Sequence, residues 1–239
     1  MEVYVGTSGW LYDWNEGLDL DWYIRYSGLN AVELNASFYR FPFPNQVKSW
    51  ARKSSRTGLR WAVKVHRSIT HYRRLTERAL EIFERFRRVM SPLEEAGLLD
   101  FYLFQMPPNF TRKQANLERV EAFLKGSGLD PWRMALELRH KSWFNKETVE
   151  WASGLGMTLV SIDAPIATWI VSSNGIVYLR MHGRSDWYAH DYTIEELGEV
   201  VAEIKGLNPR KVYVFFNNDH WMLGNARTML KLLQEKANE

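Results

Sequence analysis

Short runs of β-branched and aromatic residues alternate along the whole chain with longer segments that have a helical spacing of apolar positions. The first kind of run is typical of buried strands and the second of amphipathic helices. The runs that predict strands are Val3–Thr7, Ala31–Asn35, Arg60–His66, Asp100–Gln105, Met134–Arg139, Thr158–Asp163, Val177–His182 and Val212–Asn217. The segments that predict helices are Asp21–Tyr26, Gln46–Lys53, Thr76–Met90, Lys113–Leu124, Lys146–Ser153, Ile194–Lys205 and Leu223–Lys236. Between the sixth and seventh strands only a single turn is predicted, around Ile166–Ile170.

This strict alternation predicts an α/β protein with the TIM (β/α)8 barrel fold and a parallel eight-stranded sheet. Parallel neighbours need a crossover connection, and a helix between successive strands supplies it. Barrels of this kind usually take about 250 residues, and the chain has 239. No linker, charge block or change in composition interrupts the pattern, so residues 1–239 are predicted to form a single domain.

The ends of the predicted strands share a second pattern. Successive side chains on a strand face opposite ways, so Val32 and Leu34 leave Glu33 and Asn35 together on the other face. The apolar face must pack against the outer helices, which directs the polar face into the barrel mouth. The side chains that this rule places there are Thr7, Glu33, Asn35, Lys64, His66, Gln105, Glu137, Arg139, Ser161, Asp163, Arg180, His182 and Asn217. The sequence therefore predicts a polar, mixed-charge site at the C-terminal rim of the barrel.

The histidines support the same location. Each of the six lies at the end of a predicted strand or in the loop that follows it: His66, His71, His140, His182, His190 and His220. The alternative is a set of buried ion pairs that only satisfy one another. A network of that kind at one end of a barrel would be an odd source of stability, because desolvating so many charges is costly.

Composition narrows the class of protein further. Hydrophobic residues make up 46% of the chain, which is enough for a large core, and the formal net charge of +3 allows an anionic ligand but falls short of a nucleic-acid signature. The absence of cysteine excludes disulfides, thiolate metal sites and a cysteine nucleophile. No leader precedes the first strand, and no apolar stretch approaches the roughly 20 residues of a membrane span. We therefore expect a cytoplasmic protein with no membrane partner.

Several fragments also resemble a known family. They are GTSGW (Gly6–Trp10), VELNASFYR (Val32–Arg40), ITHYRRL (Ile69–Leu75), FQMPPNF (Phe104–Phe110), LELRHKSWF (Leu136–Phe144), SIDAP (Ser161–Pro165), VYLRMHG (Val177–Gly183) and FFNND (Phe215–Asp219). Together they resemble the YecE-like family of domains of unknown function, number seventy-two in that series. The resemblance implies a TIM barrel and no settled activity. His66 stands where the family commonly has a proline, so this histidine is a poor candidate for a shared catalytic role.

The predicted rim has the residue types that acid–base chemistry needs. Nearby carboxylates and bases push their pKa values apart, as a general acid and base require. The candidate catalytic residues are Glu33, Lys64, Glu137, Asp163 and His182. In this interpretation Glu137 or Glu33 is the base and His182 an acid or ligand. The candidate substrate-binding residues are Asn35, Tyr39, His71, Gln105, Arg139, Arg180, Asn217 and Asp219.

No cofactor is required by this chemistry, but a divalent metal is an open alternative. The ligands would come from Glu33, Glu137, Asp163, His182 and Asp219. The cations at the rim compete for the same carboxylates, and no compact HExxH motif is present. No Gly-x-Ser-x-Gly elbow surrounds Ser8, which is therefore interpreted as a turn residue rather than a nucleophile.

The leading hypothesis is an enzyme, a hydrolase, lyase or isomerase, that acts on a small polar or anionic molecule. The substrate would be sugar-like or phosphorylated, and the chemistry acid–base or metal-assisted. Two alternatives stay open: a barrel that binds nucleic acid or processes phosphodiesters, and a non-catalytic ligand-binding barrel. The arginines between Arg67 and Arg88 are interpreted as a solvated face, because Glu77, Glu81 and Glu84 interleave with them at helical spacing. The substrate and the oligomeric state are not predicted.

Overall fold

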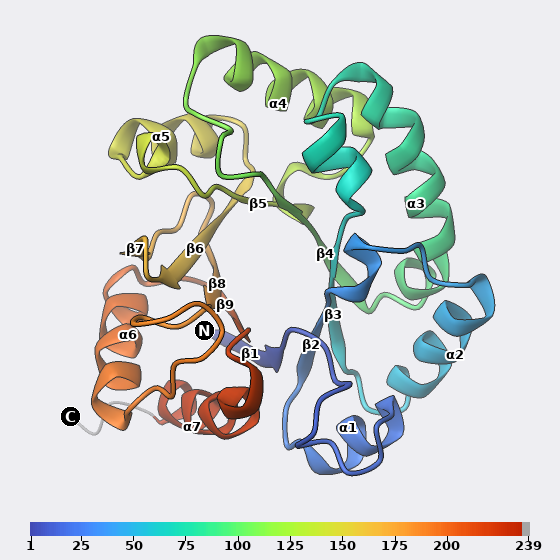
Figure 1. The fold of residues 1–239 in the computed structure, drawn as a ribbon, viewed down its shortest axis with the longest axis vertical. Helices are drawn as coiled ribbons and strands as arrows, with labels where there is room; N and C mark the ends of the chain where they lie inside the picture. The colour runs from blue at the N-terminus through green and yellow to red at the C-terminus, as the bar shows by residue number, and fades with distance from the viewer. Residues whose placement is uncertain (236–239) are drawn as a thin grey trace. The chain divides into compact units, whose positions relative to one another are not determined.

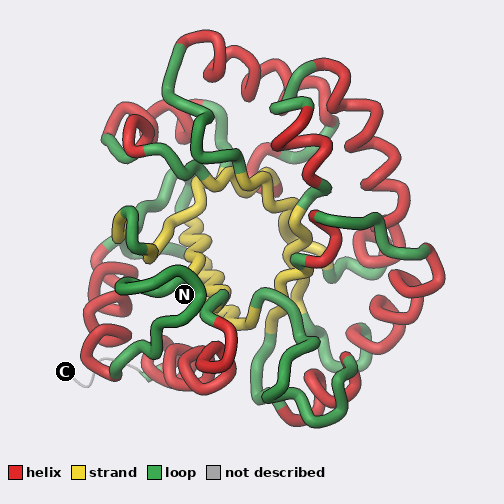
Figure 2. Tube along the Cα trace, viewed as in Figure 1, coloured by secondary structure: helices red, strands yellow, loops and turns green. Residues whose placement is uncertain are grey.

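The computed structural model describes residues 1–235 and has the predicted TIM (β/α)8 fold. Figure 1 shows the elements in chain order, and Figure 2 shows how strands alternate with helices. The strands are β1 (Glu2–Thr7), β2 (Ala31–Leu34), β3 (Arg60–Lys64), β4 (Leu99–Gln105), β5 (Met134–Glu137), β6 (Thr158–Ala164), β7 (Ala167–Trp169), β8 (Ile176–Met181) and β9 (Lys211–Phe216). The α-helices are α1 (Leu20–Tyr26), α2 (Pro44–Ser54), α3 (Glu77–Glu95), α4 (Gln114–Ser127), α5 (Lys146–Gly154), α6 (Ile194–Gly206) and α7 (Met222–Gln234).

The strand order confirms the predicted topology. Hydrogen-bonded neighbours run β5-β4-β3-β2-β1-β9-β8-β6-β7, with an additional pairing of β5 with β6. The registered pairs along β1, β3, β4, β5, β6, β8 and β9 are parallel. The turn predicted around Ile166–Ile170 is wrong: β7 folds back onto β6 as an antiparallel strand, pairing Ala167 with Ala164 and Trp169 with Ile162. The end of the last predicted helix, Lys236, lies outside the described residues.

Several strands end one or two residues earlier than predicted. β5 ends at Glu137 rather than Arg139, and β8 ends at Met181 rather than His182. Arg139 and His182 therefore lie in the loops that follow these strands, although the His182 N–H still donates to the Asp163 carbonyl oxygen at 2.7 Å. Loops of this kind carry function more freely than strands, because their side chains are not fixed by the pleat.

The chain contains two compact units, which are treated one at a time below. The first unit comprises Met1–Glu33 and the chain from Val160 onward, and the second comprises Leu34–Leu159. In the first unit α7 packs on β1 and β9, and α6 packs on α7. Gly6 on β1 stands so close to β2 that a Cβ atom there would overlap the carbonyl oxygen of Ala31. This close approach explains why a residue with no side chain occupies the middle of a buried strand.

The second unit is built on β3, β4 and β5, with α2, α3 and α4 packed in series. Phe83 of α3 meets Phe104 of β4 and Phe123 of α4 with ring centroids 5.3 and 5.7 Å apart, so aromatic contacts join the sheet to both helices. Between β3 and α3 the chain forms a π-helix, η2 (Ser68–Tyr72). π-Helical turns are rare and occur mostly at functional sites.

Candidate functional site

A buried ion pair lies at the centre of the first unit. The Arg180 guanidinium, at the end of β8, donates to both oxygens of Glu33 on β2, from Nη2 to Oε1 at 2.6 Å and from Nε to Oε2 at 3.0 Å. Both side chains are completely buried. These two polar strand ends, predicted to share the inward-facing side, contact each other in this unit. A bidentate pair of this kind fixes the position and orientation of both groups.

Two hydroxyl groups complete the surroundings of the Glu33 carboxylate. Ser8 Oγ donates to Oε1 at 2.7 Å and Tyr178 Oη donates to Oε2 at 2.7 Å. Each oxygen of Glu33 thus accepts from a hydroxyl as well as from Arg180. The sequence analysis placed Ser8 in a turn and did not single out Tyr178, although Tyr178 shares the strand parity of Arg180.

His182 lies two residues after Arg180 and contacts the guanidinium of this pair. Its Nε2 lies 3.4 Å from Nη1 of Arg180, and its Nδ1 lies 3.2 Å from the amide of Asn217 after β9. The indole of Trp187 packs against the imidazole with ring centroids 5.4 Å apart, and Tyr188 meets it edge-on at 6.0 Å. His182 is therefore fully buried. His182 and Asn217, both predicted at the rim, are thus in contact at the ends of adjacent strands.

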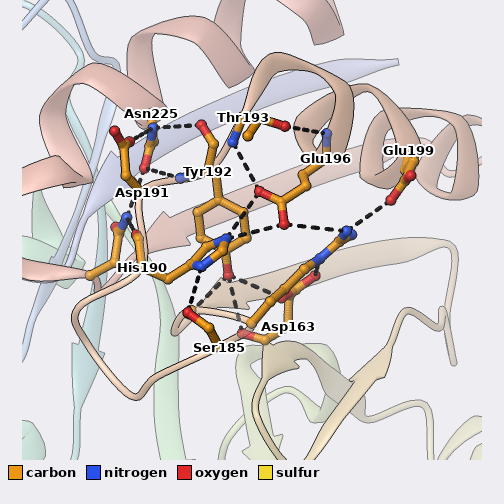
Figure 3. A network of polar contacts seen from close by, with 12 residues as sticks. Asp163, Ser185, His190, Asp191, Tyr192, Thr193, Glu196, Glu199 and Asn225 are labelled. Atoms are coloured by element: carbon orange, nitrogen blue, oxygen red, sulfur yellow. Dashed lines mark hydrogen bonds and ion pairs between the residues drawn. The ribbon is translucent and has the colours of Figure 1, made fainter.

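Asp163, at the end of β6, is held from two sides (Figure 3). Arg184 Nε donates to Oδ2 at 3.0 Å, and Tyr192 Oη donates to Oδ1 at 3.0 Å. The backbone N–H of Gly183 in turn donates to Tyr192 Oη at 2.9 Å. Burial, together with the neighbouring Asp163 carboxylate, raises the pKa of Tyr192 far above its ordinary value, so the phenol stays protonated and remains a donor.

The same network continues along the loop between β8 and α6. Arg184 Nη1 also binds Glu199 Oε2 at 2.8 Å, and His190 Nε2 lies 3.0 Å from Glu196 Oε2 (Figure 3). Ser185 Oγ contacts the other ring nitrogen of His190 at 2.9 Å. These contacts fasten residues 183–193 to the end of β6 and the start of α6. Sequence reasoning missed this role, because the partners lie in a loop with no periodic pattern.

The second unit contains a different kind of cluster. The ammonium of Lys64, at the end of β3, lies 4.3 Å from the centroid of the Phe38 ring, and the His71 imidazole meets the same ring edge-on at 4.9 Å. Thr70 Oγ1 lies 3.0 Å from Nδ1 of His71. Phe38 comes from the 3-10 turn η1 (Ala36–Phe38), so two successive loops place a cation and an imidazole on one aromatic ring.

Burial and nearby cations together lower the pKa of His71. Burial, followed by the positive charges of Lys64, Arg139 and Arg74, lowers the pKa of His71 to about 4, and the Glu137 carboxylate opposes this only in part. The imidazole is therefore neutral at physiological pH. Lys64 and Arg139 are thus two of the three cations that act on His71 in addition to burial.

Glu137 and Arg139 form an ion pair beside this histidine. Arg139 Nε donates to Glu137 Oε1 at 2.6 Å, with the carboxylate fully buried and the guanidinium nearly so. Gln105, at the end of β4, stands in register with Glu137 on the neighbouring strand. Tyr39 lies at the edge of the cluster, with its ring 5.1 Å from Phe38. Asn35 contributes its carbonyl oxygen, which accepts from the Phe38 backbone N–H at 3.0 Å.

The predicted site residues thus fall into groups. Glu33, Asp163, Arg180, His182 and Asn217 lie in the first unit, and Asn35, Tyr39, Lys64, His71, Gln105, Glu137 and Arg139 lie in the second. A single ring that unites both groups stays a prediction. Asp219 is exposed in the 3-10 turn η5 (Asp219–Trp221), where the adjacent His220 Nδ1 lies 2.7 Å from Asp13 Oδ2.

Residues 1–235 contain neither a cluster of metal ligands nor a helix able to cross a membrane. In this range no three or more histidine, aspartate or glutamate side chains come together as metal ligands. No helix in the same range combines the length and the apolar character needed to cross a membrane.

Comparison with known proteins gives one family over almost the full length. The family described as "Protein of unknown function DUF72" matches residues 4–239. The UPF0759 protein YunF of Bacillus subtilis is 24% identical over 269 residues, covering 97% of this chain and 94% of that protein.

Solved structures agree with this result. A DUF72 family protein from Enterococcus faecalis superposes with a TM-score of 0.85 at 22% identity, covering 99% of this chain and 97% of that one. A DUF72 family protein from Thermotoga maritima gives 0.82 at 28% identity, with coverage of 98% and 100%. D-Psicose 3-epimerase, crystallised in the presence of D-fructose, gives 0.61 at 10% identity, with coverage of 98% and 100%, and therefore shares the fold alone.

Proposed function

This chain belongs to the DUF72 family of proteins of unknown function, and we propose that it is an enzyme that converts a small, sugar-like substrate bearing an anionic group by acid–base chemistry. The observation that carries the proposal is the cluster of Lys64, His71, Glu137 and Arg139 in the second unit. It combines two cations, a neutral imidazole and an oriented carboxylate, which are the parts needed to hold an anion and move a proton.

Lys64 and Arg139 would hold the anionic group. After burial, their charges are the next largest causes of the low pKa of His71, and the Lys64 ammonium and the His71 imidazole contact the same Phe38 ring, so an anion bound here would be attracted by both cations. Arg139 presents a planar donor that suits a phosphate or carboxylate, and Lys64 adds a compact charge that can follow the ligand. Phe38 keeps the Lys64 ammonium in place through its ring face.

His71 would respond to the substrate's charge. In the free protein its pKa is about 4 because burial and nearby cations disfavour the imidazolium. A bound phosphate or carboxylate would offset those cations and raise the pKa of His71 toward neutrality. The imidazole could then take up or release a proton when substrate is present, and it would stay neutral when the site holds only water.

Glu137 would serve as the base. Its contact with Arg139 Nε fixes the carboxylate at the end of β5, which is where active-site groups of TIM barrels are expected. Glu33 and Asp163 are saturated by donors in the first unit, so in this proposal they support the fold. A likeness in fold to an enzyme named for epimerising D-psicose is consistent with a sugar-like substrate.

The test is proton exchange on a defined panel. Aldose and ketose phosphates, with the same sugars lacking phosphate as matched controls, would be incubated with the protein in D2O and followed by NMR. We expect deuterium incorporation next to the carbonyl of at least one phosphorylated sugar, a loss of at least about a hundredfold with Glu137→Gln, and a rise in KM of about tenfold or more with Lys64→Met. Chemical denaturation would establish that each variant is folded.

Three outcomes would contradict the proposal. Absence of exchange together with an unchanged melting temperature for every member of the panel would remove the substrate class. Binding without exchange would identify a non-catalytic ligand-binding barrel. Exchange that chelators abolish and that Mn²⁺ or Zn²⁺ restores would replace the acid–base mechanism by a metal-assisted one.

A further inference from the structure

The second unit exposes several large aromatic rings beside arginines. Tyr39, Phe43 and Tyr72 have 67%, 54% and 66% of their surface exposed. With Arg40 and Arg67 they form what we call the Arg–Tyr surface. Rings of this size usually contribute to a core, so their exposure together indicates a surface made for contact.

The arginines of this surface contact the rings. The Arg67 guanidinium lies 6.0 Å from the Tyr39 centroid and 5.6 Å from the Tyr72 centroid, so one cation is within reach of both tyrosines. Arg40 lies over the Phe43 ring at 4.4 Å. Cation–π contacts hold the arginine planes near the ring faces and leave their charge available to a ligand.

The sequence around this surface is strongly basic. Between Glu33 and Glu77 the chain carries no aspartate or glutamate, whereas it carries ten Lys and Arg residues: Arg40, Lys48, Arg52, Lys53, Arg56, Arg60, Lys64, Arg67, Arg73 and Arg74. The whole chain has 31 basic and 28 acidic residues, so the rest of it has 21 against 28. The small overall charge therefore hides a basic segment within a chain that is otherwise acidic.

Neutralising partners are missing at this surface. Within residues 1–235 no carboxylate forms an ion pair with Arg40, Arg67 or Arg73. Elsewhere in the same unit arginines do find partners, as Arg88 does with Glu84 at 3.1 Å. Uncompensated positive charge next to exposed rings is the combination that anionic, aromatic ligands require.

The backbone holds this arrangement in place. Tyr72 closes the π-helix η2, and the two residues that begin the turn into α3, Arg74 and Leu75, both have positive φ angles, of 46° and 59°. Left-handed conformations cost energy at residues with a Cβ, and they persist where the surroundings require them. Leu75 is buried, so it anchors the turn that presents Tyr72 and Arg73 outward.

We propose that the Arg–Tyr surface binds single-stranded nucleic acid. Unstacked bases would lie on Tyr39, Tyr72 and Phe43, and phosphates would pair with Arg40, Arg67 and Arg73. A duplex hides its base faces and would leave the rings without partners, and an acidic peptide offers charge but no rings to stack. This proposal does not depend on the enzymatic function proposed above.

The test is fluorescence anisotropy of the full chain with a labelled oligothymidine of about 15 nucleotides. We expect the single strand to bind at least about tenfold more tightly than a duplex of the same length, with affinity falling steeply between roughly 50 and 200 mM salt. Arg67→Gln or Arg73→Gln should lower the slope of log K against log salt by about 1. Tyr72→Ala should weaken binding about tenfold and leave that slope unchanged.

Arg88→Gln is the matched control, because Arg88 is an exposed arginine of the same unit whose charge is already paired with Glu84. It should leave both the affinity and the salt slope at their wild-type values. The proposal is overturned if neither probe binds, if the duplex binds as tightly as the single strand, or if Tyr72→Ala has no effect. It is also overturned if Arg88→Gln weakens binding as much as Arg67→Gln does, or if a mononucleotide or polyglutamate competes as well as the oligonucleotide.

Discussion

Arginines of the two units have opposite surroundings. Two arginines of the first unit bind carboxylates. Arg180 pairs with Glu33. Arg184 pairs with Asp163, Glu196 and Glu199. Arg40 and Arg67 of the second unit contact aromatic rings; Arg40 is exposed and Arg67 is half-buried. The same residue type thus stabilises the fold in one region and presents charge in the other. The contacts of an arginine therefore determine its role, and a buried arginine contributes more to the stability of the fold than an exposed one.

The first expected effect is the largest and concerns the buried pair. Glu33→Gln keeps the shape of the side chain but leaves Arg180 buried without a counter-charge, which should lower the free energy of unfolding by about 3–5 kcal/mol. Urea denaturation measures this change. Glu2→Gln is the control, since Glu2 pairs with Lys211 on the surface of the same unit and exposed ion pairs contribute little to stability. Equal stabilities of the two variants would show that the Glu33 pair does not support the fold.

A smaller effect is expected at Asp163. Asp163→Asn removes the charge that Arg184 and Tyr192 bind, but Arg184 keeps its contact with Glu199, so the loss should be about 1–3 kcal/mol. Hydrogen exchange should become faster at residues 183–193 before other parts of the first unit. Glu199→Gln changes only the exposed arm of the same network and should leave stability within about 0.5 kcal/mol. If Glu199→Gln costs as much as Asp163→Asn, the buried carboxylate is not the anchor of this loop.

A substitution on the Arg–Tyr surface should lower stability less than Asp163→Asn does. Arg67→Gln loses two exposed cation–π contacts, so the free energy of unfolding should fall by less than about 1 kcal/mol. Thermal and urea denaturation beside the wild type would measure it. A loss as large as that of Glu33→Gln would mean that Arg67 belongs to the scaffold, and the contrast between the two units would disappear.

His71 should have no effect on stability at neutral pH and a measurable one in acid. Its pKa is about 4 in the folded chain, because burial and nearby cations disfavour the imidazolium, against about 6.5 when unfolded. The unfolded chain then binds more protons between these values, so the stability that neutral His71 supports is lost as the pH falls from about 6.5 to 4. Denaturation at a series of pH values should show that the free energy of unfolding of His71→Gln falls less between about pH 6.5 and about pH 4 than that of the wild type. An NMR titration of the wild-type imidazole near pH 6.5 would contradict this expectation.

Periodicity was enough to predict the barrel, because each strand and helix has its own apolar spacing and the alternation is regular. It did not predict β7, since three residues with half-exposed or exposed side chains give no strand pattern of their own. The strand parity placed Glu33 and Arg180 on the same side, and the two side chains form a buried pair. It could not identify Ser8 as a partner, because a turn serine and a serine that donates to a buried carboxylate have the same local sequence.

The remaining parts of the site lie beyond simple pattern reasoning for physical reasons. Arg184 and Tyr192 act through a loop whose conformation depends on tertiary contacts. The low pKa of His71 depends on its burial and on charges that come from separate segments of the chain. The basic segment between Glu33 and Glu77 could have been read from the sequence, but the balanced total charge conceals it.

The lack of room for a side chain at Gly6 limits which mutations its codon can tolerate. Any single-base missense change in a glycine codon introduces an amino acid with a Cβ atom, and on β1 that atom would overlap the Ala31 carbonyl oxygen. Every one of those alleles must push β1 away from β2, the strand that bears Glu33. In a saturation mutagenesis library we therefore expect the Gly6 codon to tolerate only synonymous change, although no atom of a Gly6 side chain exists to take part in binding or catalysis.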